Sequence, residues 1–127
     1  MLTHVMVGVD DLDAAKIFYD AILAVLGHGP GILDGTGRAF YPSSTVAIGI
    51  GKPANGEPAS VGNGGTIGFA ASSAEQVDAW HAAGVAAGGT TCENPPGIRD
   101  LGPAGKIYAA YLRDPAGNKL AASFRVG

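Results

Sequence analysis

The chain has 127 residues, of which 46% are hydrophobic, and this is enough apolar material for the core of one ordinary domain. Its formal charge of −3 comes from 8 basic and 11 acidic residues that are scattered singly, so no basic stripe is present to hold a nucleic-acid backbone. No apolar run approaches the roughly 20 residues of a membrane-spanning helix, and no basic stretch leads into an apolar block as in a secretory leader. With a single cysteine, Cys92, and therefore no disulfide within the chain, we expect a soluble, cytoplasmic protein without nucleic-acid or membrane partners.

Residues 2–9 alternate in the manner of a half-buried strand. One face carries Val5, Val7 and Val9, and the other carries His4, Met6 and Gly8. The following segment has apolar residues at helical spacing, with a capping residue at Asp10 and a stop at Gly27. We therefore predict a strand followed by an amphipathic helix.

A second strand and helix follow 62 residues further along the chain. Residues 66–71 resemble a strand, Ser72 and Glu75 have the spacing of a capping box, and the helical pattern stops at Gly88 and Gly89. Trp80 then corresponds to Phe18 without any gap, and both are predicted to lie in the core. Because caps, stops and apolar spacing repeat together, the chain is interpreted as a duplicated unit.

Further strands are predicted after each helix, at residues 38–41, 45–50, 106–113 and 119–125. Residues 114–118, Asp-Pro-Ala-Gly-Asn, predict a hairpin between the last two strands. The turn-forming segment 52–64 divides one domain, residues 1–127, into a first module of about 1–51 and a second of about 65–127. Residues 94–105 are predicted to form a long loop at the rim of a binding site.

Four features together resemble the vicinal-oxygen-chelate superfamily, which contains glyoxalases, bleomycin-resistance proteins and extradiol dioxygenases. They are His4 on the first strand, the Asp-Leu-Asp start of the helix at 11–13 with Phe18-Tyr19, the Gly-Asn-Gly approach at 62–64, and the hairpin at 113–119. The resemblance implies an α+β fold in which two βαβββ modules form a curled mixed sheet around a shared cleft, with the helices outside.

The resemblance also implies positions for metal ligands, and most of them are lost. His4 fills the first histidine position, but Thr66 and Ala121 occupy the second histidine and the glutamate positions, and residues 46–50 contain no carboxylate. Since an open catalytic site normally uses three protein ligands, we expect no nickel, zinc, iron or manganese ion bound by one chain alone. His28 and His81 are expected to lie away from the cleft, and a site shared between subunits stays open.

His4 is the candidate catalytic residue, as a general base or a hydrogen-bonding group at the cleft, because histidine titrates near neutral pH. The alternative is a histidine that is inherited from a metal-binding ancestor and is now only packed. The strand pattern adds further positions that we expect to contact a ligand. These are Met6, Thr66, Ala121 and Ser123.

Two more candidates come from the second module. Of Tyr108 and Tyr111, which point to opposite faces of one strand, Tyr108 is predicted to reach the cleft, where it would stack on a ligand or simply pack. Arg99 in the predicted long loop would clamp an anionic group or remain solvated.

Three functions are therefore considered. The first is a small-molecule-binding protein with a degenerate metal site, similar to drug-sequestering members of the superfamily. The second is a metal-dependent lyase, isomerase or dioxygenase, for which the fold is the only strong argument. The third is a metal-free enzyme that uses His4 as acid or base, with Tyr108 or Arg99 steadying charge. A homodimer is expected from the unpaired sheet edges, and the ligand is not named by the sequence.

Overall fold

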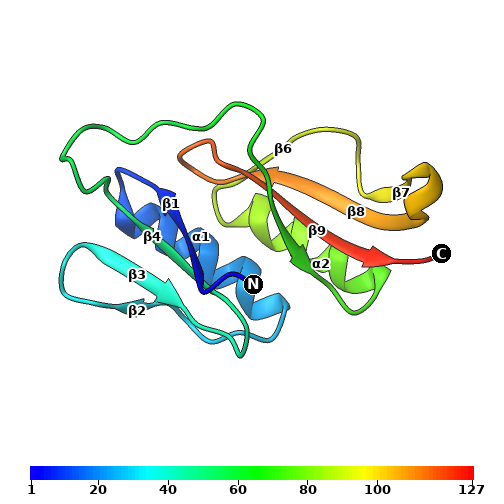
Figure 1. The fold of residues 1–127 in the computed structure, drawn as a ribbon, viewed down its shortest axis with the longest axis horizontal. Coiled ribbons are helices and arrows are strands. Elements are labelled where there is room, and N and C mark those ends of the chain that lie inside the picture. Colours follow the sequence, from blue (N-terminus) through cyan, green and yellow to red (C-terminus); the bar gives the residue numbers. More distant parts are fainter.

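The first half of the chain forms one βαβββ unit in the computed structural model, which describes residues 1–127 (Figure 1). Its elements are β1 (His4–Gly8), α1 (Leu12–Val25), β2 (Ile32–Leu33), β3 (Arg38–Tyr41) and β4 (Ala47–Gly51). The sheet has the strand order β1-β4-β3-β2, in which β1 runs parallel to β4 and the other pairs are antiparallel. The chain that connects these two parallel strands contains α1 together with β2 and β3, which gives the long crossover that parallel pairing requires.

The second half repeats this plan. Its elements are β5 (Ile67–Ala70), α2 (Ala74–Ala86), β6 (Thr90–Thr91), β7 (Gly97–Asp100), the 3₁₀ turn η1 (Gly102–Ala104), β8 (Lys106–Arg113) and β9 (Lys119–Arg125). The order is β5-β9-β8, with β6 and β7 both paired to the outer edge of β8, where β2 stands in the first half. The predicted α+β fold of two βαβββ modules is confirmed, and its strands form two separate mixed sheets. The shared strand order supports a duplicated unit.

Both helices begin one residue later than predicted. Asp11 and Ser73 are the N-caps, and their side chains accept hydrogen bonds of 3.0 Å from the backbone N–H groups of Ala14 and Gln76. Each predicted cap is followed by a second residue that caps equally well, so the sequence alone does not choose between the two. The 62-residue spacing between the helices is unchanged by this correction.

The prediction of a structureless loop over residues 94–105 is wrong, because this segment contains β7 and η1. The four residues of β7 show no clear alternation of apolar and polar side chains, and the strand is held by its antiparallel pairing with β8. The two-residue strands β2 and β6 were also not predicted, because they are too short to carry a periodic pattern. Neither helix is long and apolar enough to cross a membrane.

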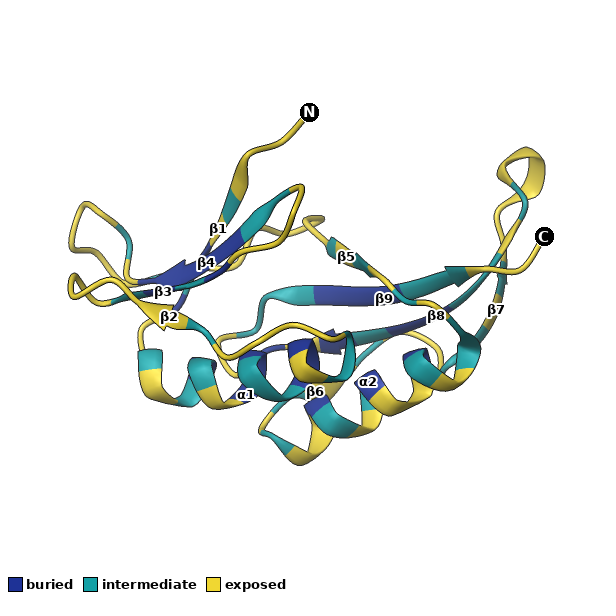
Figure 2. Ribbon diagram, turned by 90° about the horizontal axis from the view of Figure 1, so that it is seen from below, coloured by how far each residue is buried: buried dark blue, intermediate teal, exposed yellow.

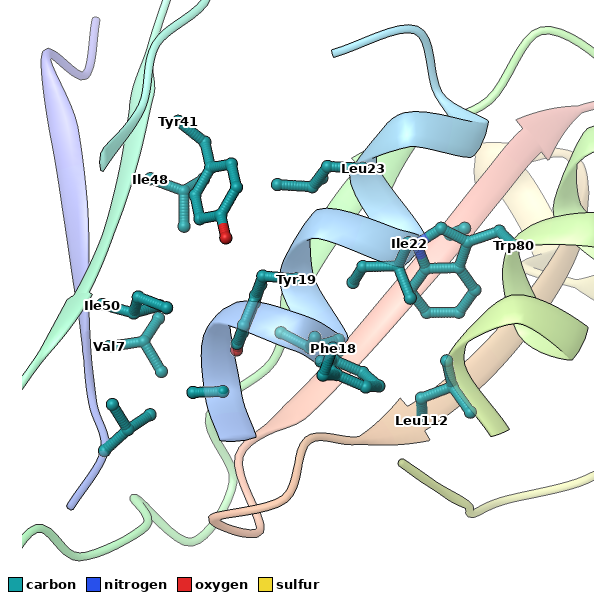
Figure 3. Packing of buried hydrophobic residues seen from close by; sticks show 14 of the residues in the cluster. Val7, Phe18, Tyr19, Ile22, Leu23, Tyr41, Ile48, Ile50, Trp80 and Leu112 are labelled. Atoms are coloured by element: carbon teal, nitrogen blue, oxygen red, sulfur yellow. The ribbon is translucent and has the colours of Figure 1, made fainter. Parts of the chain in front are cut away.

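The core lies between the helices and one face of each sheet (Figure 2). Phe18 and Trp80 are fully buried, as predicted, and they lie in one cluster with Leu112 of β8 (Figure 3). Gly84 lets α2 pack closely against α1 and β8. A Cβ atom at this position would stand only 3.1 Å from Ile22 of α1 and would clash with Leu112 of β8. Because both helices lie on the same side, no helix covers the opposite face of each sheet; we call it the helix-free face.

One buried carboxylate joins the two halves. Asp114, in the turn between β8 and β9, is 3% exposed and accepts hydrogen bonds from the backbone N–H groups of Ala116 and Asn118 at 2.9 and 2.8 Å. It also accepts from the hydroxyl of Tyr19 on α1 at 2.7 Å and from the side-chain amide of Asn118 at 3.0 Å. That same amide donates to the carbonyl of Gly8 at the end of β1, 3.0 Å away. The hairpin of the second half is therefore fastened to both α1 and β1.

Tyr19 acts as a fixed donor in this network. Burial of its ring, together with the charge of Asp114 and the hydrogen bond to it, raises the pKa of the Tyr19 hydroxyl far above its usual range. The hydroxyl therefore keeps its proton, and Asp114 keeps a donor for one of its oxygens.

Replacing Tyr19 by phenylalanine tests the junction. The change removes one hydrogen bond to a buried carboxylate and leaves the ring in place, so we expect a loss of about 2 kcal/mol in the free energy of unfolding. Urea unfolding followed by the fluorescence of Trp80 would measure it. Tyr108→Phe is the matched control, because its hydroxyl makes an equally short 2.7 Å bond to Asp78 at the surface. A loss as small as that of the control would contradict the structural role of Tyr19.

Candidate functional site

The helix-free face of the first half is formed by alternate residues of three strands. His4, Met6 and Gly8 lie opposite Ala47, Gly49 and Gly51 of β4, and Arg38 and Phe40 of β3 lie opposite Gly51 and Gly49. Met6 is 44% exposed, whereas Val7 and Val9 belong to the core. The predicted division of the β1 residues between two faces is therefore confirmed.

In the second half the same face carries Ala121 and Ser123 of β9, which lie opposite Gly68 and Ala70 of β5. Tyr111 of β8 lies opposite Ala121 and shares this face. Tyr108 lies opposite Phe124 on the helix side, and its hydroxyl donates to Asp78 on α2. This bond, with a smaller effect of burial, raises the pKa of Tyr108. The prediction that Tyr108 is the tyrosine at the cleft is wrong, because the hairpin register places Tyr111 there.

Basic and acidic residues lie in different elements of the fold. Six basic residues lie in strands, whereas Asp100 is the single strand carboxylate; the carboxylates of Asp13, Asp20, Glu75 and Asp78 are on the helices. The strand pairing places five of these cations on the helix-free face, namely Arg38, Arg99, Arg113, Lys119 and Arg125. A chain with a net charge of −3 therefore presents a basic face to solvent.

A hollow of about 490 Å³ lies over the first sheet and is the one that contains His4. Its lining comprises most of β1, Arg38 and Phe40 of β3, and residues 51–54 at and just after the end of β4. The Nδ1 atom of His4 lies 2.9 Å from the hydroxyl oxygen of Thr3, which leaves the Nε2 atom without a protein partner. His4 is thus an exposed hydrogen-bonding group at the edge of an open site.

Met6 is the one other predicted site residue that shares this hollow. Thr66 lines a second hollow of about 350 Å³, at the junction of the halves, together with Met6 and Asn118. His28 lines a small apolar hollow of about 170 Å³ between the two halves on the helix side. His81 lies 2.8 Å from the hydroxyl of Thr91, and burial lowers the pKa of its imidazole.

Arg99 is held by its own loop. Its guanidinium donates to the carbonyl oxygens of Asn94, Pro95 and Gly97 at 2.8, 2.9 and 3.2 Å. An arginine side chain has five N–H donors, so most of the fork is used in closing the turn before β7. Arg99 therefore binds mainly the backbone of its own loop, whereas the sequence suggested that it would bind an anionic group or remain solvated.

Two cations flank the ring of Tyr111. The guanidinium carbon of Arg99 and the ammonium of Lys119 lie 5.6 and 5.2 Å from the ring centroid. Lys119 also forms an ion pair with Glu93, and this hydrogen bond lowers the pKa of the Glu93 carboxyl. The ring and both charges are thus engaged with one another on this part of the face.

The donor set does not fit the divalent metal that the family fold implies. No three side chains of histidine, cysteine, aspartate or glutamate lie together in the structure. His4 has Thr3 as its hydrogen-bonding neighbour, Thr66 offers a hydroxyl in a different hollow, and Ala121 offers no donor atom. A catalytic site normally needs three protein ligands, and one chain supplies a single suitable one.

Three residues of the site were not identified from the sequence. Arg38, Phe40 and Lys52 line the hollow with His4, but no motif marks them. Tyr111 is different, because a signal was present: counting back from the hairpin pairs Arg113 with Lys119 and therefore Tyr111 with Ala121, which was already placed in the cleft.

The repeated strand order of the two halves, each with one helix against a mixed sheet, defines the architectural class, and comparison with known proteins gives the family. The model of the Glyoxalase/Bleomycin resistance protein/Dioxygenase superfamily matches residues 1–122, so the chain belongs to this superfamily. No curated protein matches the chain.

Solved structures agree with this assignment. A glyoxalase/bleomycin resistance protein from Albidiferax ferrireducens is 60% identical, with a TM-score of 0.93 over 97% of this chain and 98% of that one. A lactoylglutathione lyase from Agrobacterium tumefaciens is 25% identical, with a TM-score of 0.66 over 97% and 92% of the two chains. A family enzyme from Burkholderia phytofirmans is similar in fold, at 19% identity and a TM-score of 0.73 over 98% of each chain.

Substituting Arg99 by methionine tests its role in the loop. The change removes the three bonds to carbonyl oxygens, so we expect amide hydrogen exchange over residues 93–99 to rise about tenfold while β5 and β9 stay protected. Lys106→Met is the control, because the side chain of Lys106 forms no ion pair. Unchanged exchange in Arg99→Met would show that the loop does not depend on this side chain.

Proposed function

We propose that this protein binds a small molecule on its helix-free face and does so without a metal ion held by its own residues. The observation that carries the proposal is the hollow of about 490 Å³ beside His4, which lies in the usual size range of ligand sites. The absence of a set of three metal-binding side chains supports binding without a metal.

A metal-free enzyme is the second candidate. It is favoured by His4, whose Nε2 atom has no protein partner while Nδ1 lies beside the Thr3 hydroxyl, as in a histidine oriented for proton transfer. The lyase name of the Agrobacterium tumefaciens relative supports an enzyme in general. A metal-dependent reaction would require ligands from a second chain, since this chain offers too few.

We further propose that two copies associate. The outer strand β2 leaves its edge unpaired, and its two residues Ile32 and Leu33 are each 60% exposed. An exposed, apolar edge strand is a surface that proteins normally cover.

A fragment screen by nuclear magnetic resonance tests the proposed function. We expect binding fragments to shift the amide signals of β1, β3 and β4 on the helix-free face in protein treated with a chelator. His4→Ala should retain the binding of uncharged fragments under both candidates, and it should lose turnover if the second candidate is correct. Fragments that bind only elsewhere, or only after metal is added, would contradict the proposal.

A further inference from the structure

We infer that the hollow beside His4 is selective for a small aromatic or apolar molecule that carries a carboxylate or phosphate group, bound by Arg38 and Lys52. This inference rests on the proposed function, and it adds the chemical class of the ligand. Its basis is the combination of two unpaired cations, an apolar floor and the absence of carboxylates in one hollow.

Arg38 and Lys52 differ from the other cations of the helix-free face. Arg99, Arg113 and Arg125 donate to backbone carbonyl oxygens, and Lys119 is paired with Glu93. The side chains of Arg38 and Lys52 have neither an ion pair nor a hydrogen bond in the structure. They therefore keep their donors for a ligand, and an arginine can offer two parallel donors to a carboxylate or phosphate.

Two glycines of β4 shape the hollow around these charges. The stem of Arg38 lies across Gly51, where a Cβ atom would come within 2.6 Å of its Cγ atom. Met6 and Phe40 lie over Gly49 in the same way, since a Cβ atom there would be 2.8 Å from the ring of Phe40 and would clash with Met6. The bare backbone of β4 thus lets an apolar floor and a positioned guanidinium stand side by side.

No carboxylate lines this hollow. Asp34, in the turn between β2 and β3, is engaged elsewhere: it accepts hydrogen bonds from the hydroxyl and backbone N–H of Thr36 at 2.7 and 2.8 Å. These bonds lower the pKa of Asp34, and the charge of Arg38 adds a smaller contribution. The local charge is therefore positive, and an anion would be attracted into the hollow.

The volume of about 490 Å³ accommodates a molecule of the size of a single ring with an acidic group. The ring would lie on Met6 and Phe40, and the acidic group would reach Arg38 and Lys52 with the Nε2 atom of His4 as a further donor. A neutral molecule of the same shape would contact only Met6 and Phe40 and would therefore bind more weakly.

The experiment compares three probes of similar size, namely phenyl phosphate, benzoate and benzyl alcohol, in titrations followed by the amide signals of the chelator-treated protein. We expect at least one of the two anions to bind at β1, β3 and β4 about tenfold more tightly than benzyl alcohol, and the preferred anion to identify the ligand as a phosphate or a carboxylate. Arg38→Gln and Lys52→Gln should each weaken anion binding by about tenfold and leave benzyl alcohol unaffected, because a charged hydrogen bond is lost.

Two further variants make the comparison sharp. Lys106 lies outside the hollow and forms no ion pair, so Lys106→Gln removes a comparable cation and should leave the binding of all three probes unchanged. Arg38→Lys keeps the charge and should retain most of the affinity. Lys52 is exposed and follows the end of β4, so its substitution tests the inference even if Arg38→Gln folds poorly.

Each remaining outcome has a clear meaning. Equal binding of benzyl alcohol and both anions at this hollow would overturn the anion inference and leave the proposed binding function intact. Anions that shift only the signals around Arg99 and Lys119 would overturn it as well. If no probe and no fragment of the screen bound to the helix-free face, the proposed function itself would fail.

Discussion

The buried carboxylate of Asp114 is the contact on which the arrangement of this protein depends. It accepts hydrogen bonds from its own turn and from Tyr19 of α1, and Asn118 extends the network to the end of β1. A buried charge is costly unless every oxygen is satisfied, so this network selects one relative position of the two halves. That position puts both helices on one side and leaves the opposite face of each sheet open (Figure 2).

The open face explains how an acidic chain can present a basic surface. Four carboxylates are on the helices and Asp11 caps one of them, while five of the six cations in the strands point to the opposite face. Most of these cations are engaged with carbonyl groups or Glu93, and they stabilise loops and edges. Arg38, and Lys52 just after β4, have no such partner, and they stand in the same hollow as His4.

Much of the fold was predictable from the sequence, because alternation over β1 and helical spacing around Phe18 and Trp80 are both strong signals. The limits have physical causes. Paired capping residues hide the exact start of each helix, and β7 depends on its partner strand. The alternation of side chains along β8 showed that Tyr108 and Tyr111 lie on opposite faces. It did not show which face carries the helices, and Tyr108 was assigned to the wrong face. The role of Arg38 depends on Gly51, a residue distant in sequence that only the strand register brings beside it.

The most direct test of the account is the metal content of the purified protein, measured together with ligand binding. Protein would be incubated in turn with nickel, zinc, iron(II) and manganese, analysed for bound metal, and titrated with a fragment that binds the helix-free face, before and after chelation. We expect far less than one ion per chain and the same ligand affinity in both states. About one ion per chain, lost in His4→Ala together with ligand binding, would contradict it and point to a metal site completed by a second chain.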